Sequence, residues 1–254
     1  MFISAPADME HPPQRIVSLV PSLTELLFYL GLDKETIGIT KFCVHPEEWF
    51  RTKTRIGGTK DVNIQKLASL LPDLVLCNKE ENTAEQVNAI AEKFSVWLTD
   101  IKTFEDSLRM IIAIGDLTGK TAAAEKLVAD IQTAFASIEH LRQEKLRTAY
   151  LIWKDPYMTI GGDTFISDMM GKAGLENIYK DQLRYPQLTI AELQALKPEL
   201  LLLSSEPFPF KEKHIAELQV SLPGTKILLA DGEMFSWYGS RMLAAAGYFK
   251  GLIS

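Results

Sequence analysis

The sequence predicts an α/β protein with two lobes, each containing its own parallel sheet. Three observations predict this fold: one pattern occurs twice, strands alternate with helices in both halves, and a long stretch in the middle contains neither Pro nor Gly. Strand–helix alternation is typical of parallel sheets, because a parallel connection must cross back along the sheet before the next strand begins.

The repeated pattern occupies residues 62–76 and then residues 188–202, a shift of 126 positions. Both copies carry Ile, Leu, Leu, Pro, Leu and Leu in the same register. Each copy predicts a short amphipathic helix, a proline that ends it, an acidic residue and a buried strand. A helix followed by a proline, an acidic residue and a strand is also a common connection in α/β proteins. The matched register favours two lobes of one design, with a ligand cleft between them.

The first 14 residues are polar and proline-rich, which predicts a flexible lead-in, and residues 15–118 form the predicted N-terminal lobe. Its expected strands are residues 15–20, 36–40, 74–77 and 96–98. Between the first two strands, Ser22 and Glu25 are spaced as a capping box for a helix that ends at Gly31.

Residues 119–146 are predicted to form a linking helix, and residues 147–254 the C-terminal lobe. Apolar side chains recur at helical spacing along the linker, at Leu127, Ile131, Phe135, Ile138 and Leu141. A helix from Lys120 to Lys145 would be roughly 37 Å long, enough to cross from one lobe to the other. The alternative is a long helix packed within one domain.

Composition excludes some classes of protein. A net charge of -6 and a pI near 5.4 argue against a nucleic-acid-binding protein, which usually has a basic face. No apolar run reaches transmembrane length. The first ten residues lack the charged and apolar regions of a secretory signal, so we expect either a cytosolic chain or one whose leader is missing here. Cys43 and Cys77 could pair or stay free.

Aromatic residues gather at or just after the predicted strand ends, the edge that faces the ligand crevice in open α/β sheets. They are Phe42, Trp49, Trp153, Tyr157, Tyr185, Phe235, Trp237 and Tyr238. Aromatic walls suit a large, flat, partly apolar ligand such as a macrocycle, although any one of these residues could equally belong to the core. Asp155, Asp231 and Glu233 also follow strands, where local turn roles are favoured. Arg241 could bind an anionic group or pair on the surface.

Other chemistry has weaker support. Cys43 and His45 could begin a metal site, but no further ligands converge in the sequence, so no metal is predicted. Nucleotide-binding, hydrolase and zinc-protease motifs are missing, and no cofactor or catalytic residue is predicted. The amides of Gly161 and Gly162, at a helix entry, could hold an anion.

Four segments carry a resemblance to a known family. The segments at residues 15–26, 55–58 and 71–76, with residues 198–202 in the second lobe, resemble the class III substrate-binding proteins of ABC importers. The resemblance covers about residues 15–250 and is strongest to the cobalamin-binding branch. It implies two Rossmann-like lobes joined by one rigid backbone helix. It also implies a periplasmic protein, expected to be a monomer, that binds a corrinoid, haem or ferric siderophore and delivers it to an ABC permease in the membrane.

The resemblance also implies site residues. Ligand-walling positions of the family fall on or near Phe42, Trp153, Tyr185, Phe235 and Trp237, and two family tryptophans fall on Thr59 and Asn78. With Tyr157 and Arg241, these make up the predicted ligand-binding set. The family's docking glutamates fall on Gln65 and Ala191. Glu80, Glu81 and Glu192 lie nearby as substitutes for permease docking.

The sequence therefore predicts a binding protein with no chemistry of its own. The competing hypothesis is a cytosolic enzyme or ligand sensor that reuses the two-lobed fold. A third is a metal chaperone based on Cys43 and His45.

Overall fold

The computed structural model describes residues 1–139 and 144–253, and these divide into two compact units. Unit 1 comprises Met1–Ile101, Glu105–Asp130 and the distant segment Trp237–Arg241. Unit 2 comprises Lys102–Phe104, the described part of Ile131–Ser236, and the chain from Met242 onward. Each unit contains one parallel sheet, so the predicted two-sheet α/β fold is confirmed.

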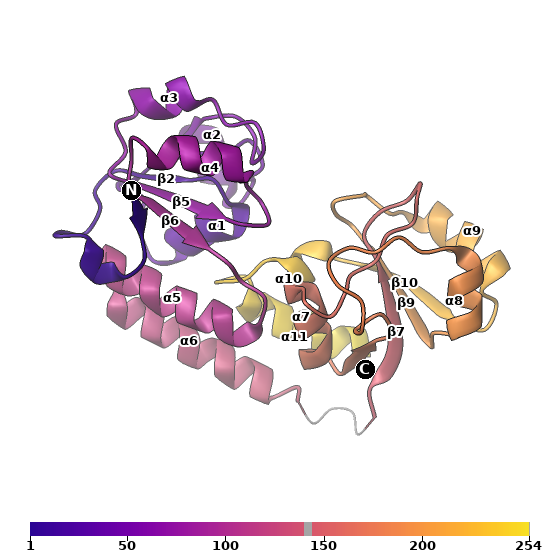
Figure 1. Ribbon diagram of the computed structural model, residues 1–254. Coiled ribbons are helices and arrows are strands. Elements are labelled where there is room, and N and C mark those ends of the chain that lie inside the picture. Colours follow the sequence, from indigo (N-terminus) through magenta and orange to yellow (C-terminus); the bar gives the residue numbers. More distant parts are fainter. Residues whose placement is uncertain (140–143, 254) are drawn as a thin grey trace. The chain divides into compact units, whose positions relative to one another are not determined.

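Figure 1 shows the elements of the first half and labels most of them. In chain order they are β1 (Phe2–Ile3), η1 (Pro6–Asp8), β2 (Ile16–Ser18), α1 (Pro21–Tyr29), β3 (Thr36–Ile39), α2 (Glu47–Thr52), β4 (Thr54–Arg55), α3 (Ile64–Ser69), β5 (Leu74–Asn78), α4 (Ala84–Ala91), β6 (Val96–Thr99), α5 (Phe104–Thr118) and α6 (Thr121–Ala136). Those of the second half are β7 (Leu146–Leu151), α7 (Phe165–Lys172), β8 (Leu175–Asn177), α8 (Ile190–Leu196), β9 (Leu200–Ser204), α9 (Glu212–Ser221), β10 (Lys226–Ala230), α10 (Gly232–Ser236) and α11 (Met242–Ile253).

The two sheets share one topology. Their strand orders are β1-β6-β5-β2-β3-β4 and β10-β9-β7-β8. In each, the first strand of the common set (β2 or β7) lies between the second (β3 or β8) and the third (β5 or β9), and the fourth (β6 or β10) lies beyond the third. The repeated pattern ends in β5 in one unit and in β9 in the other. The repeat therefore marks the same position in two related sheets.

Both central strands are buried along their whole length, as a parallel sheet covered by helices requires. β5 and β9 contain no exposed residue. The core of unit 1 joins β2 and β5 to α3 and α4, through residues such as Val17, Val75 and Leu67. The core of unit 2 joins β7 and β9 to α8 and α9, through residues such as Leu151, Leu201 and Leu193.

An arginine and an aspartate close the amino-terminal edge of the sheet in unit 1. The Asp73 carboxylate accepts from the backbone N–H groups of Gln14 (2.7 Å) and Arg15 (2.9 Å). The Arg15 guanidinium donates to the carbonyls of Leu70 and Leu71, at the end of α3. Leu71 has a positive φ of 46°, so the chain turns sharply before Pro72 and begins β5 beside β2.

Unit 2 repeats this arrangement, which we call the arginine–acid clasp. The Glu199 carboxylate accepts from the backbone N–H of Arg147 at 2.9 Å. The Arg147 guanidinium donates to the carbonyls of Leu196 (2.9 Å) and Lys197 (3.2 Å). Lys197 has a φ of 48°, matching Leu71. The same turn occurs in both units and accounts for the acidic residue and the proline in each copy of the repeat.

Several details differ from the sequence prediction. The first residues, expected to be a flexible lead-in, include a strand: β1 pairs in parallel with β6, and Ile3 is buried. The capping box predicted at Ser22 and Glu25 is wrong, because Val20 is the N-cap of α1 and Pro21 is its first residue. Proline is favoured at that position, since its missing N–H would be unpaired there anyway.

The predicted linking helix is shorter than expected. α6 ends at Ala136, whereas the prediction extended it to Lys145, and the predicted position Leu141 lies outside the described residues. α5 and α6 lie side by side (Figure 1), and an added Cβ at Gly115 would come within 2.3 Å of the Ala124 Cβ. The division between the units falls within α6, after Asp130. Within the described residues, no helix has the length and apolarity needed to cross a membrane.

We expect Asp73→Ala to lower the free energy of unfolding by about 1–2 kcal/mol, because two backbone N–H groups lose a charged acceptor. Chemical denaturation monitored by circular dichroism measures the change. Asp130→Ala is the matched control: it removes an exposed carboxylate paired with Lys126 within α6, worth only about 0.3–0.5 kcal/mol. Equal losses in the two variants would contradict the role of the clasp.

Candidate functional site at the carboxyl edges of the sheets

The loops that follow the parallel strands bring most of the predicted site residues to the carboxyl edge of their sheet. Phe42 follows β3, Glu80 and Glu81 follow β5, and Trp153 follows β7. Neighbouring connections leave β2 and β5 in opposite directions, and those of β7 and β9 do the same. Ligands of open α/β sheets bind outside such switch points. The carboxyl edge of each unit is therefore the candidate site.

In unit 2, three predicted aromatic residues come together on a short antiparallel structure. The backbone of Met158 forms isolated antiparallel β-bridges with Trp153 and with Gln187. The loops carrying Trp153, Tyr157 and Tyr185 therefore lie alongside one another. Trp153 is 40% exposed, and its ring meets Phe208 edge-on at 5.8 Å between centroids. A partly exposed indole ring that is held in place by a neighbouring ring is suited to stacking against a flat ligand.

Two glycines hold this surface in place. The N–H of Gly161 donates to the carbonyl of Arg184 (2.7 Å), and that of Gly162 to the carbonyl of Gln182 (2.9 Å). An added Cβ would lie 2.5 Å from the Gln182 oxygen at Gly161 and 2.0 Å from the Lys180 oxygen at Gly162. The predicted anion-binding role of these amides is wrong, because both already donate within the chain.

In unit 1, Phe42 is the most exposed of the predicted aromatics, at 51%. The Lys41 ammonium lies 5.3 Å from the centre of its ring and 3.7 Å from the Asp61 carboxylate. Gly58 packs close behind, since a Cβ there would come within 3.1 Å of the Phe42 ring. Phe42 is thus a half-exposed aromatic ring that packs against the loop ending at Asp61.

The segment Trp237–Arg241 returns to unit 1 from the far end of the chain. Arg241 pairs with Glu25 of α1 at 2.8 and 3.0 Å, and its guanidinium covers the Trp237 ring at 4.9 Å. His45 meets the same ring edge-on at 5.6 Å. Arg241, predicted as a ligand contact, is therefore engaged by Glu25. The sequence assigned Glu25 to a cap and gave no signal for this distant pairing.

Three further predicted ligand contacts are buried. Phe235 is 0% exposed and packs in the core of unit 2 against Tyr150 and Phe249. In unit 1, the Asn78 amide donates to Thr99 at 3.0 Å, and the Thr59 carbonyl accepts from Asn82 at 2.9 Å. These groups pack or form hydrogen bonds within their own unit, and none presents a surface to a ligand in this structure.

The predicted docking glutamates have different surroundings. The Glu192 carboxylate accepts from the backbone N–H and the hydroxyl of Thr189, which completes the capping box of α8. Glu80 and Glu81 lie in the turn after β5, where both backbone N–H groups donate to the Asn78 side chain. Gln65 and Ala191 are the second residues of α3 and α8, two helices in equivalent positions.

Cys43 and Cys77 are both buried and free, so they form no disulfide. Burial raises the pKa of the Cys77 thiol to about 12 and also raises that of Cys43, which lies 3.0 Å from the Thr24 hydroxyl. Among the described residues no group of three or more His, Cys, Asp and Glu side chains is arranged to hold a metal ion. Cys43 and His45 therefore belong to no such group in the described part of the chain.

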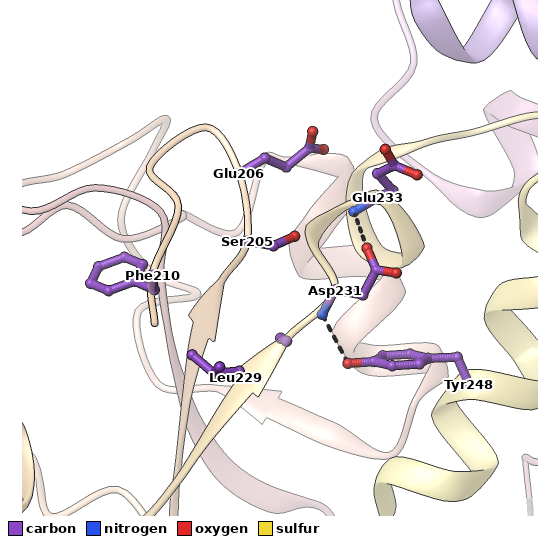
Figure 2. Close-up of a pocket in the computed structure, with 8 residues that line it drawn as sticks. Ser205, Glu206, Phe210, Leu229, Asp231, Glu233 and Tyr248 are labelled. Carbon is purple, nitrogen blue, oxygen red and sulfur yellow. Dashed lines mark hydrogen bonds between the residues drawn. The ribbon is translucent and has the colours of Figure 1, made fainter. Parts of the chain in front are cut away.

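A hollow of about 550 Å³ lies at the carboxyl ends of β9 and β10 in unit 2 (Figure 2). Its polar lining includes Ser205, Glu206, Asp231, Glu233 and Tyr248. Asp231 accepts from the N–H of Glu233 at 3.1 Å, and its own N–H donates to the Tyr248 hydroxyl at 2.9 Å. The turn role predicted for Asp231 and Glu233 agrees with this local hydrogen bond.

Comparison with known proteins identifies the class. A sequence profile described as periplasmic binding protein matches residues 16–221, most of the chain. The chain therefore belongs to the periplasmic binding protein family. The substrate-binding role predicted from the sequence resemblance is confirmed at this level.

Individual relatives are distant. An uncharacterized ABC transporter substrate-binding lipoprotein of Bacillus subtilis is 28% identical over 74% of this chain, which spans 63% of that protein, less than two thirds. A vitamin B12-binding protein of Pectobacterium carotovorum is 23% identical over 92% of this chain and 86% of its own length.

Solved structures show the same fold. The periplasmic vitamin B12-binding protein BtuF of Vibrio cholerae is 20% identical, covers 95% of this chain and 97% of its own, and gives a TM-score of 0.82. The periplasmic heme-binding protein RhuT from Roseiflexus is also 20% identical, covers 95% of this chain and 99% of its own, and gives 0.79.

We expect Gly162→Ala to lower the free energy of unfolding by about 1–3 kcal/mol, because the added methyl group collides with the backbone of Lys180. Chemical denaturation measures the loss, and limited proteolysis near residues 180–185 reports displacement of that loop. Gly224→Ala is the control, since a Cβ there meets nothing within 4 Å. A stability as little changed as that of the control would rule out the close packing described for this loop.

Proposed function

We propose that this protein is the substrate-binding component of an ABC importer and captures a corrinoid or another flat metal chelate, such as haem or a ferric siderophore. The observation that carries the proposal is the pair of exposed aromatic residues, Phe42 and Trp153, each fixed at the carboxyl edge of a parallel sheet in a member of the periplasmic binding protein family. Relatives whose names state vitamin B12 or heme binding support this class of ligand.

The geometry supports binding by stacking and polar rim contacts. Phe42 and Trp153 offer partly exposed apolar rings, and the loops that carry Tyr157 and Tyr185 lie beside the loop of Trp153. Flat ligands gain from such contacts because both partners lose water-exposed apolar area. The Trp237 ring is buried and lies under the Arg241 guanidinium, so it offers little surface to a ligand. We leave Phe235, Thr59, Asn78 and Arg241 out of the proposed direct contacts, because the fold already uses them.

Delivery to a membrane permease, and a periplasmic or lipid-anchored location, follow from the same proposal. Glu80, Glu81 and Glu192 are the proposed residues for permease docking, and the Glu192 carboxylate also caps α8. The proposal requires no chemistry of the protein itself. It also includes the absence of enzymatic activity.

Titration with cyanocobalamin, haem and a ferric siderophore tests the proposal, with intrinsic tryptophan fluorescence and calorimetry as independent readouts. Saturable binding of one ligand identifies the branch. No binding of any of them contradicts the proposal and favours the enzyme or sensor hypothesis.

For the ligand that binds, we expect Phe42→Ala and Trp153→Ala each to weaken affinity about tenfold, because each removes a stacking surface of about 1–2 kcal/mol. Calorimetric dissociation constants measure the loss. Val220→Ala, which shortens an 83% exposed side chain on α9, is the matched control. Wild-type affinity in both aromatic variants would show that the ligand binds elsewhere.

A further inference from the structure

The first turn of α9 is held by a histidine side chain. Lys211 is the N-cap residue of this helix, and its backbone N–H donates to Nδ1 of His214 at 2.9 Å. Glutamate or glutamine usually fills this position of a capping box, because its side chain accepts from the N-cap N–H. Here an imidazole nitrogen is the acceptor, and it can accept only while it carries no proton.

The same imidazole packs among aromatic rings that lead to the candidate ligand surface. His214 is buried, and its ring centre lies 5.5 Å from that of Phe208 and 5.4 Å from that of Phe210. The ring of Phe208 in turn lies 5.8 Å from that of Trp153, the exposed aromatic residue proposed to stack on the ligand. Ring contacts from His214 through Phe208 to Trp153 therefore connect a helix cap to the proposed binding surface of unit 2.

A second contact joins α9 to the loop of Trp153. Lys154, the next residue of that loop, forms an ion pair with Glu217, which lies three positions beyond His214 on α9. The hydrogen bond from Lys154 lowers the pKa of the Glu217 carboxyl, so this ion pair keeps its charge in mild acid. His214 is thus the group in this support whose charge can change between neutral and mildly acidic pH.

The surroundings of His214 disfavour its protonation. Four charged side chains act on the imidazole, and three of them are cationic: Lys154 from the loop after β7, and Lys211, Lys213 and Glu217 on α9 or at its N-cap. Burial, followed by the charge of Lys154, lowers the pKa of His214 below its ordinary value of 6.5, and only the Glu217 carboxylate opposes this change. The positive end of the α9 dipole also disfavours an imidazolium.

Protonation and the helix cap therefore exclude each other. With a proton on Nδ1 of His214, two donors would face each other across 2.9 Å, so the ring must leave the N–H of Lys211. An imidazole released to water binds a proton near pH 6.5, whereas the capped imidazole does so only at lower pH. The cap is fully formed above about pH 6.5. Well below that pH, the ratio of released to capped protein rises about tenfold for each pH unit until the capped form is itself protonated.

From these contacts we infer that His214 is a positioning residue for Trp153. Its neutral imidazole holds the start of α9 and the ring of Phe208 in place, and protonation releases both, so that Trp153 loses the ring that supports it. The inference rests on the proposed function and adds a form of regulation to it: the protein holds its ligand at neutral pH and binds it more weakly in mild acid.

Hydrogen exchange of the Lys211 amide tests the cap without any ligand. In the wild-type protein we expect its protection factor to fall about tenfold between about pH 7.5 and 5.5, because exchange follows the released form. His214→Gln supplies an acceptor that does not titrate, so its protection factor should stay constant over this range. His11→Gln is the matched control: it removes an exposed histidine of unit 1 and should behave like the wild type.

The fluorescence emission of Trp153 tests the connection through Phe208. This emission is measured as the difference between wild-type and Trp153→Phe protein. In acid it should shift to longer wavelength, because water reaches a ring that has lost its neighbour, and the shift should be absent in His214→Gln. Phe208→Leu should remove the shift while exchange of the Lys211 amide keeps its dependence on pH.

Ligand affinity completes the test, with cyanocobalamin, haem and a ferric siderophore as probes. For a probe that binds, the dissociation constant of the wild type should rise at least about threefold more than that of His214→Gln between about pH 7.5 and 5.5. Failure of all three probes to bind contradicts the proposed function alone, because the exchange and emission measurements need no ligand. Identical pH profiles of wild type and His214→Gln in those two measurements would overturn the inference.

Discussion

Burial of both faces of a parallel sheet is the constraint on which the rest of the structure depends. Helices cover both faces of β5 and β9, so neither strand can present side chains to a ligand from the middle of its sheet. All polar and aromatic recognition groups must therefore come from loops at the ends of strands. The amino-terminal edges are occupied by the arginine–acid clasps, whereas the carboxyl edges carry Phe42 in one unit and Trp153 in the other.

The aromatic residues at the carboxyl edges depend on supports that lie beneath them. Gly161 and Gly162 fasten the loop of Tyr185 by backbone hydrogen bonds, and Gly58 allows close packing behind Phe42. Rigid support matters for a binding protein, because side chains already held in place lose little conformational entropy when a ligand arrives. The ion pair between Arg241 and Glu25 likewise holds the segment Trp237–Arg241 in place on unit 1.

The two units contain related sheets, but the outer edges of these sheets differ. In unit 1 the outer edge of β6 is closed by β1, a strand of only two residues. In unit 2 the corresponding strand, β10, pairs only with β9 among the described residues. The internal repeat therefore conserves the central strands and the clasp, but not the periphery of the sheets.

The sequence by itself determined the two α/β units, the alternation of strands with helices and the place of the repeat, because these follow from local periodicity and from proline. It also placed Phe42 and Trp153 correctly after their strands. Tertiary structure alone decided that Phe235 is buried while Trp153 is exposed, that Arg241 pairs with Glu25, and that Arg15 and Arg147 close the two repeats. The physical reason is that such contacts join segments far apart in the chain. Periodicity reports which face of an element is apolar, but not which distant group packs against it.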